Sequence, residues 1–398
     1  MMQQYLDIKK DYTDFIVFFR LGDFYEMFFT DAIIASKELE IVLTGRDAGV
    51  EERVPMCGVP FHAADVYVER LIEKGFKVAI VEQIEDPSLA KGLVKRDVIR
   101  LVTPGTVIDE ASLDAKSNNY IAALGSTKDR YIIACSDLTT GENFIVTMPR
   151  EIELLTSEIM NLSLKELVVS SDFNQKLLRS HLELSAFTLS LSDARTLPEY
   201  YRNLVQEIYD KDLLATFASL INYLIKTQRR ELLHMQKVRL FESRQYLRLD
   251  NNSIRNLELV ETARAGLRKG SLFWLLDRCQ TAMGSRLLKQ NLLRPLIEKD
   301  KIETRFSLVE SLNDNFIVRE DIRNQLKNVY DLERIVGRVS FGNANGRDLV
   351  NLKRSLRTIP VIRESLGVLD NPYAHTLLAE MDDFATLASL IDAAIIDN

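Results

Sequence analysis

The stretch Phe18-Phe19-Arg20-Leu21-Gly22-Asp23-Phe24-Tyr25-Glu26-Met27-Phe28-Phe29 holds six aromatic residues in twelve. Wound as one helix, at about 100° per residue, its last four aromatic residues would span about 140° of one face, which a hydrophobic core explains by itself. That helix would place Glu26 about 200° from Phe24, whereas an extended segment puts residues i and i+2 on the same face. Because the next helix signal, an N-cap, comes only at Thr30-Asp31, we interpret Phe24-Tyr25-Glu26 as extended.

The segments around this stretch alternate between strand and helix patterns, which predicts a small mixed α/β region. Strands are expected at 15–19, 41–44, 76–83 and 98–102, and helices at 30–40 and 62–75. Pro55 and Gly58-Val59-Pro60 predict a turn between them. Thr103-Pro104-Gly105-Thr106 is a second turn signal, and the polar run 114–119 after it is interpreted as a linker.

The remainder of the chain has two different patterns. Strands are expected at 120–123, 131–135, 143–147 and 166–170, with helices near 150–162 and 172–180, so that a second α/β domain follows the linker. From about Leu213 onward the β-patterned runs vanish and apolar residues recur at helical spacing. The last part of the chain is therefore predicted to be all-helical.

The composition limits the classes of protein to which the chain can belong. The chain has 398 residues, 46% hydrophobic and 27% charged, which suits a protein of several globular domains. It has no apolar run long enough to span a membrane and no secretory signal pattern, so a cytoplasmic location is expected. The three cysteines and four histidines are scattered, which predicts buried free thiols and no metal centre; these residues are Cys57, Cys135, Cys279, His62, His181, His234 and His375.

The net charge of -7 opposes any general electrostatic attraction to nucleic acid, but the charge is unevenly distributed. Residues 225–305 hold 18 basic and 9 acidic side chains, whereas residues 1–110 hold 13 and 20. The basic excess is interpreted as a charged helix surface with i,i+4 acidic partners rather than as a DNA track. If the first 110 residues bind DNA, they must do so through a few placed groups.

Several blocks of the sequence resemble the MutS family of DNA mismatch-repair proteins, in family order over nearly the whole chain. The first is 19–28 in the aromatic stretch. The others are Pro55-Met56-Cys57-Gly58-Val59-Pro60-Phe61-His62-Ala63, Val81-Glu82-Gln83-Ile84-Glu85-Asp86-Pro87, Arg100-Leu101-Val102-Thr103-Pro104-Gly105-Thr106, Leu247-Arg248-Leu249-Asp250, Arg255-Asn256-Leu257-Glu258-Leu259, Met283-Gly284-Ser285-Arg286-Leu287-Leu288, Asp331-Leu332-Glu333-Arg334 and Arg347-Asp348-Leu349.

This resemblance implies a fold class of α/β plus all-α. It implies a mismatch-recognition domain over 1–110, a linker over 111–119, a connector domain with an RNase H-like fold over 120–235, and an incomplete helical core or lever domain over 236–398. The DNA partner would be a duplex with mispairs or small loops. Phe24 and Glu26 would form the family's Phe-x-Glu element, which enters the minor groove at the mispair, and Arg46 would match a basic position near the DNA backbone. Without the resemblance, Arg46 could equally be a solvated surface arginine with no role in DNA binding.

The wedge chemistry implied for Phe24 is physically sound. An aromatic side chain inserted between base steps must offset an unstacking cost of a few kcal/mol, and a mispaired base is cheaper to unstack. Discrimination then comes from deformability of the duplex rather than from hydrogen-bond readout. Glu26 is repelled by phosphates unless it accepts a hydrogen bond from a base or becomes protonated, so we expect it to penalise an intact duplex.

Two other functions remain open on the sequence. An RNase H-like enzyme centred on Asp137 would need several convergent carboxylates to hold a divalent metal, whereas a single acid before a turn favours a structural role. A helical scaffold that binds protein partners would be favoured if Phe24 had no effect on DNA binding.

No GxxxxGK[ST] phosphate loop occurs in the sequence, so no P-loop enzyme activity and no cofactor are expected in this chain. By resemblance, ATP and Mg²⁺ would bind in a C-terminal ATPase domain that also carries most of the dimer interface. The family further implies a MutL-type repair partner. We expect a chain that ends within the helical core and is monomeric or weakly associating, with some core surface uncovered.

Overall fold

The computed structural model describes residues 1–47, 53–85, 94–108, 113–181, 187–242 and 245–395. It contains two compact units, and neither is one continuous segment of chain. The first unit comprises residues 1–112, 119–125 and 164–231. The second comprises residues 113–118, 126–163 and 232–398.

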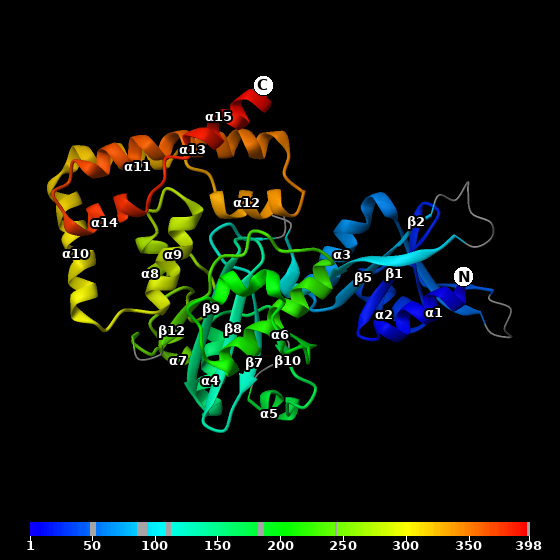
Figure 1. Cartoon of the computed structure of the whole chain (residues 1–398). Helices are drawn as coiled ribbons and strands as arrows, with labels where there is room; N and C mark the ends of the chain where they lie inside the picture. Colours follow the sequence, from blue (N-terminus) through cyan, green and yellow to red (C-terminus); the bar gives the residue numbers. More distant parts are fainter. Residues whose placement is uncertain (48–52, 86–93, 109–112, 182–186, 243–244, 396–398) are drawn as a thin grey trace. The chain divides into compact units, whose positions relative to one another are not determined.

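A six-stranded mixed sheet, here called the recognition sheet, forms the first part of unit 1 (dark to light blue in Figure 1). Its strand order is β3-β4-β2-β1-β5-β6, and only β1 and β5 are parallel neighbours. The strands are β1 Phe15–Leu21, β2 Phe24–Phe28, β3 Thr44–Arg46, β4 Val54–Pro60, β5 Lys77–Gln83 and β6 Arg96–Val102. The helices of this region are α1 Met2–Asp11, α2 Phe29–Leu39 and α3 Ala64–Glu73, with the 3-10 turns η1 Phe61–Ala63 and η2 Pro104–Thr106.

The aromatic stretch is divided between the two faces of this sheet. Strand alternation sends Phe18, Tyr25 and Met27 into one core, which also contains apolar residues of α2 and α3. Phe19 and Phe28 point to the opposite face, where Tyr5 of α1 covers them. The sheet thus has helices on both faces, and its dense aromatic content is mostly core.

The rest of unit 1 continues into parallel strands. Strands β11, β10 and β7 lie in this order, and both pairings are parallel. The elements are β7 Tyr120–Ser126, β10 Glu166–Val169, α5 Gln175–Arg179, β11 Thr188–Leu191, η5 Glu199–Val205 and α6 Lys211–Gln228. Asp210 caps α6 by accepting hydrogen bonds from the amides of residues 212 and 213.

Unit 2 combines three strands with the helical part of the chain (green to red in Figure 1). Strands β8, β9 and β12 lie in this order, with β8 antiparallel and β12 parallel to β9. The strands are β8 Arg130–Asp137, β9 Glu142–Pro149 and β12 Arg239–Glu242, and helix α4 Ile152–Asn161 follows β9. The later helices are α7 Asn251–Asn256, α8 Leu272–Leu276, α9 Ala282–Leu293, α10 Lys299–Asp314, α11 Phe316–Leu326, α12 Leu332–Ser340, α13 Gly346–Gly367, α14 Pro372–Glu380 and α15 Ala385–Ala394.

The α/β plus all-α fold class predicted from sequence is confirmed, and four local predictions are wrong. The segment expected as a turn at Pro55 and 58–60 is strand β4, because it is hydrogen-bonded on both sides by β2 and β3. The strand expected at 41–44 begins only at Thr44. Strand β12 lies beyond Leu213, where β-runs were expected to vanish. Thr30 is the second residue of α2 and not its N-cap.

Candidate nucleic-acid interface

The hairpin between β1 and β2 presents Phe24 at the edge of a turn. Leu21 pairs with Phe24, so only Gly22 and Asp23 connect the strands. Gly22 has φ +56°, a left-handed conformation that glycine adopts without the steric cost of a side chain. Phe24 begins β2, which is extended as the sequence predicted, and it therefore shares a face with Glu26.

Phe24 differs from the other aromatic residues of the stretch because none of the described helices covers it. Its side chain is 47% exposed, whereas Phe28, two strand steps away on the same face, is fully buried against Tyr5. Helix α1 covers the end of this face that contains Phe28 and leaves open the end that contains Phe24. An exposed phenylalanine at the tip of a rigid hairpin is suited to contacting a partner.

Glu26 and Arg46 form an ion pair on this open end of the face. Nη1 of Arg46 donates to Oε2 of Glu26 at 2.7 Å, and the two side chains are 40% and 18% exposed respectively. Partial burial raises the pKa of Glu26, and the nearby Arg46 guanidinium opposes that rise. The structure thus brings together all three residues expected at the site, and Arg46 is paired rather than free in solvent.

Gly58 of β4 leaves the space that these side chains occupy. It pairs with Glu26, and a Cβ built on it would lie 3.3 Å from the carbonyl oxygen of Tyr25, 3.5 Å from Cγ of Glu26 and 3.8 Å from Cδ1 of Phe24. A Cβ here would be tight against the Tyr25 carbonyl and in van der Waals contact with Glu26 and Phe24, so atoms beyond Cβ would have to share the space of these two side chains. Sequence reasoning missed this role because Gly58 was interpreted as part of a turn.

A second exposed aromatic residue lies on the other side of the hairpin. Phe61 is 44% exposed, and the guanidinium of Arg20 lies 3.8 Å from the centroid of its ring. Arg20 also bonds to Glu82 at 3.4 Å and stacks on Tyr25, whose hydroxyl donates to the same carboxylate. The Phe61 ring is thus already stacked within the protein, so it is a suitable comparison for Phe24.

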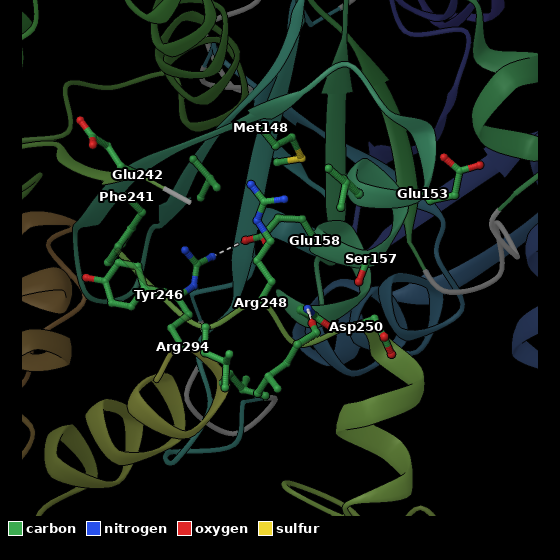
Figure 2. Close-up of a pocket in the computed structure, with 16 residues that line it drawn as sticks. Met148, Glu153, Ser157, Glu158, Phe241, Glu242, Tyr246, Arg248, Asp250 and Arg294 are labelled. Carbon is green, nitrogen blue, oxygen red and sulfur yellow. Dashed lines mark hydrogen bonds and ion pairs between the residues drawn. The ribbon is translucent and has the colours of Figure 1, made fainter. Parts of the chain in front are cut away.

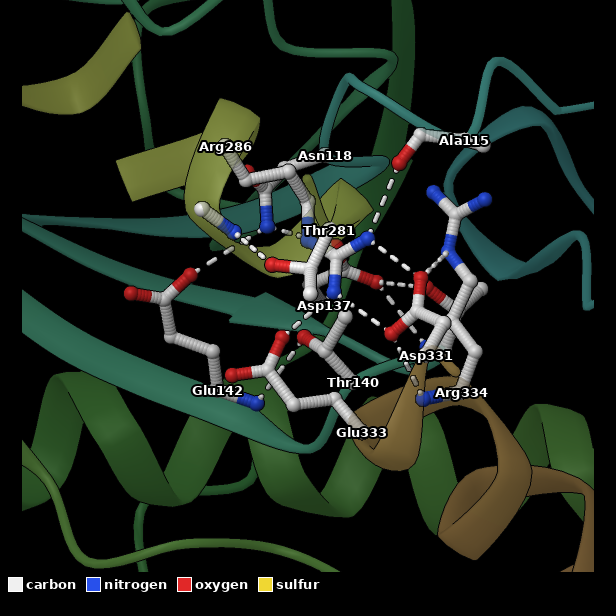
Figure 3. A network of polar contacts seen from close by, with 12 residues as sticks. Ala115, Asn118, Asp137, Thr140, Glu142, Thr281, Arg286, Asp331, Glu333 and Arg334 are labelled. Carbon is white, nitrogen blue, oxygen red and sulfur yellow. Dashed lines mark hydrogen bonds and ion pairs between the residues drawn. The ribbon is translucent and has the colours of Figure 1, made fainter. Parts of the chain in front are cut away.

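Asp137, the acid weighed as a nuclease residue, holds a turn at the end of β8. Its carboxylate accepts hydrogen bonds from the amide and the hydroxyl of Thr139 at 2.9 and 2.7 Å, and from Nδ2 of Asn118 at 2.9 Å (Figure 3). Within the described ranges, no group of three or more acidic, histidine or cysteine side chains could hold a metal ion. The geometry favours the structural role for Asp137.

The expected i,i+4 pairing within 225–305 occurs at Lys299 and Glu303, but two of the more buried arginines of this region pair with acids distant in sequence. Arg286 is buried and forms ion pairs with Asp331 and Glu333, each at 2.6 Å, and it donates to the carbonyl of Ala115 at 2.9 Å (Figure 3). Arg294 likewise pairs with Glu158. The expectation of i,i+4 helix partners is therefore wrong for these arginines, which are held within unit 2 and do not form an open basic track.

Unit 2 also contains a cavity of about 340 Å³ beside α4, lined by β9, residues 241–242 and 246–250 and the end of α9 (Figure 2). Its apolar wall includes Met148 and Phe241. Among its polar lining groups, Arg294 pairs with Glu158, and Asn161 donates to the carbonyl of Leu249 at 2.8 Å. We assign no ligand to it.

All three cysteines are free thiols, but only two of them fit the expected burial. Cys57 and Cys135 are buried, whereas Cys279 is half-buried beside the start of α9. Burial raises the pKa of Cys57 to about 12, so that thiol is protonated and unreactive at neutral pH. Among the described helices, none is long and apolar enough to cross a membrane.

The fold combines a mixed α/β part, which carries the exposed Phe24 beside Glu26, with an all-helical part, and comparisons with known proteins identify its family. Models of MutS domain I, MutS domain II and MutS domain III match residues 1–111, 119–236 and 252–398. The chain is 48% identical, over its whole length, to proteins named DNA mismatch repair protein MutS from two Bacillus cereus strains and from Bacillus thuringiensis strain Al Hakam. It spans 45% of the length of each of these relatives. The chain belongs to the MutS family.

Proposed function

We propose that this chain binds duplex DNA at mispaired or looped bases by inserting Phe24 into the minor groove. The observation that carries the proposal is the one uncovered aromatic side chain of the Phe18–Phe29 stretch, 47% exposed on an extended strand and two residues before Glu26. Strand pairing on both sides of β2 places the backbone of Phe24 before binding, so little backbone conformational entropy is lost when the ring enters the base stack.

Glu26 would test the base pair that Phe24 enters. Its carboxylate, already partly desolvated, is repelled by phosphates beside an intact duplex and accepts one hydrogen bond from a base that a mispair leaves displaced. Arg46 neutralises it at 2.7 Å in the free protein, so binding requires exchange of one partner for another. Arg46 would then be free to contact a phosphate.

The proposed role belongs to DNA mismatch repair, as the names of the relatives state for those proteins. In that role this chain supplies the DNA-probing part, with no catalytic residue of its own, and acts in the cytoplasm. ATP with Mg²⁺, a MutL-type partner and a second subunit would act with parts of the relatives outside the 45% matched here.

The test compares affinities for a G·T-mispaired duplex and for its fully paired counterpart at a fixed salt concentration. We expect the wild type to prefer the mispair, Phe24→Ala to lose that preference, and Phe61→Ala, which removes an equally exposed ring on the other side of the hairpin, to keep it. Equal effects of the two substitutions would refute the wedge role. Unchanged DNA binding in Phe24→Ala would favour the protein-binding scaffold instead.

A further inference from the structure

Glu166, the first residue of β10, is a fully buried carboxylate that accepts four hydrogen bonds. Oε2 accepts from the hydroxyl of Thr103 and, at 3.1 Å, from the amide of Gly105. Oε1 accepts from the hydroxyl of Ser190 and, at 2.5 Å, from that of Tyr223. One oxygen thus binds the segment that follows the recognition sheet, and the other binds β11 and α6.

No lysine, arginine or histidine within the described ranges forms an ion pair with Glu166. A buried carboxylate without a counter-cation is expensive to desolvate unless hydrogen bonds satisfy its lone pairs. The four donors lie on three separate segments, namely residues 103–105, β11 and α6, so the carboxylate is well solvated by protein groups only while all three stay in place. This makes its bonding strongly dependent on geometry.

Gly105 allows the close approach that this arrangement needs. A Cβ on Gly105 would lie 2.8 Å from Cβ of Glu166 and 2.8 Å from Cβ of Ile121 in β7. Both neighbours are buried atoms next to the backbone of β-strands, so neither can move aside as a flexible side chain would. The turn 104–106 therefore sits directly on the parallel strands.

A second set of polar contacts joins the same two parts of unit 1. Buried Lys77 at the start of β5 donates to the carbonyl of Leu189 at 3.0 Å and to the carboxylate of Asp14 at 2.7 Å. The hydroxyl of Thr188 donates to the carbonyl of Gly75 at 3.0 Å. These contacts hold the recognition sheet and β11 near each other, whereas Glu166 gathers donors from both parts onto one side chain.

We propose that Glu166 is a positioning residue for mispair binding: it fixes the end of the recognition sheet to β10, β11 and α6, and so holds the Phe24 face in one orientation to these elements. The effect on DNA binding rests on the proposed function, whereas the structural role of Glu166 does not. A loosened joint would leave fewer molecules in the binding-competent orientation and would weaken apparent affinity in proportion.

Two substitutions distinguish a positioning role of Glu166 from a general contribution to the stability of the fold. Thr103→Val keeps side-chain shape but removes one of the two donors to Glu166 on the recognition side, a hydroxyl that also bonds Thr106 in the η2 turn. Tyr223→Phe removes one hydroxyl from the same carboxylate on the α6 side and leaves the recognition side bonded. Both leave Glu166 one donor short: Thr103→Val weakens the bonding on the recognition side, where the Gly105 amide remains, and Tyr223→Phe weakens it on the α6 side, where the Ser190 hydroxyl remains.

The experiment measures the distance distribution between nitroxide labels on exposed positions of α2 and α6 in the full chain, by Lys37→Cys and Lys211→Cys with Cys279→Ser. We expect a narrow distribution in the wild type and in Tyr223→Phe, and a broadened one in Thr103→Val at unchanged helix content. Equal widths in all three proteins, or equal broadening in both variants, would overturn the proposal.

A DNA arm completes the test with a G·T-mispaired duplex. Thr103→Val should bind it roughly 3- to 10-fold more weakly than Tyr223→Phe does, because fewer molecules hold the competent orientation. A broadened distribution with unchanged affinity would overturn the positioning role. The label distances are measured without DNA, so failure of the Phe24 wedge would leave them unchanged and would be recognised separately.

Discussion

Glu26 and Glu166 are two glutamates of one compact unit, each at or near the start of a β-strand, and they are held in opposite ways. Glu26 is partly exposed and has one cationic partner, Arg46 of β3, across the intervening strand β4. Glu166 is fully buried and is held by four neutral donors. The first arrangement can exchange its partner for a ligand at small cost, whereas the second cannot lose a donor without leaving a buried charge unsatisfied.

A residue that probes DNA and a residue that positions other elements therefore differ in burial and in the number of their partners. A residue that must respond to DNA needs exposure and a replaceable partner. A residue that holds a fixed joint needs burial and several partners from different segments. Substitution of Glu166 should therefore affect mainly the stability of the protein. Substitutions on the face that carries Phe24 and Glu26 should affect mainly DNA discrimination.

The largest expected effect is on stability. Glu166→Ala leaves four buried donors without their acceptor and should lower the free energy of unfolding by about 3 kcal/mol. Glu26→Ala removes a partly exposed ion pair and should change it by less than about 1 kcal/mol. Urea denaturation of both variants measures this difference, and similar losses in the two would contradict the comparison.

Gly58→Val should produce the next largest effect, now on binding. The added side chain crowds Glu26 and Phe24 and forces one of them from its preferred rotamer, at a cost of about 1 kcal/mol, or roughly 5-fold in mispair affinity. Titration with a G·T duplex gives the affinity. Gly346→Val provides the control, because open space surrounds that glycine in α13. An equal loss of affinity in the control would show that the steric explanation is wrong.

A smaller effect concerns pH. Because burial raises the pKa of Glu26 and phosphates raise it further, lowering the pH neutralises this carboxylate and removes its repulsion from DNA. Affinity for fully paired DNA should therefore rise as pH falls from 8 to 5.5. The rise should be about 3-fold, which corresponds to the loss of one repulsive charge interaction. Glu26→Gln should bind paired DNA more tightly at pH 8 and should lack this part of the pH dependence. An unchanged slope in Glu26→Gln would assign the dependence to other groups.

The smallest effect is expected for Arg46→Gln. Loss of the exposed partner leaves the Glu26 carboxylate unopposed and removes one phosphate-directed cation, so mispair affinity should fall by about 2- to 5-fold. The salt dependence of binding should also decrease by about one ion. Affinity measured over a series of salt concentrations provides both values, and an unchanged salt slope would place Arg46 away from the DNA.

The sequence predicted the parts of this site that depend on local geometry. The i,i+2 relation of Phe24 and Glu26 requires a strand, and the family blocks around them are confirmed by the matches over the whole chain. Gly58 was misassigned because Pro55, Gly58 and Pro60 resemble a turn, and only pairing with two neighbouring strands makes this segment a strand.

The positioning joint could not be predicted from local patterns. Glu166 lies about 60 positions from Thr103 and from Tyr223 along the chain, and its residue type alone suggests a solvated surface acid. The partners of Arg286 and Arg294 are also distant in sequence. Such contacts are set by tertiary packing, which neither periodicity nor charge counts describe.

The most direct test of the central claim is the fluorescence of 2-aminopurine placed next to a G·T mispair, measured with saturating protein. An inserted ring unstacks the neighbouring base, so wild-type protein and Phe61→Ala should raise the fluorescence, whereas Phe24→Ala should leave it near the level of free DNA. The same rise with Phe24→Ala at saturation would show that Phe24 is not the wedge.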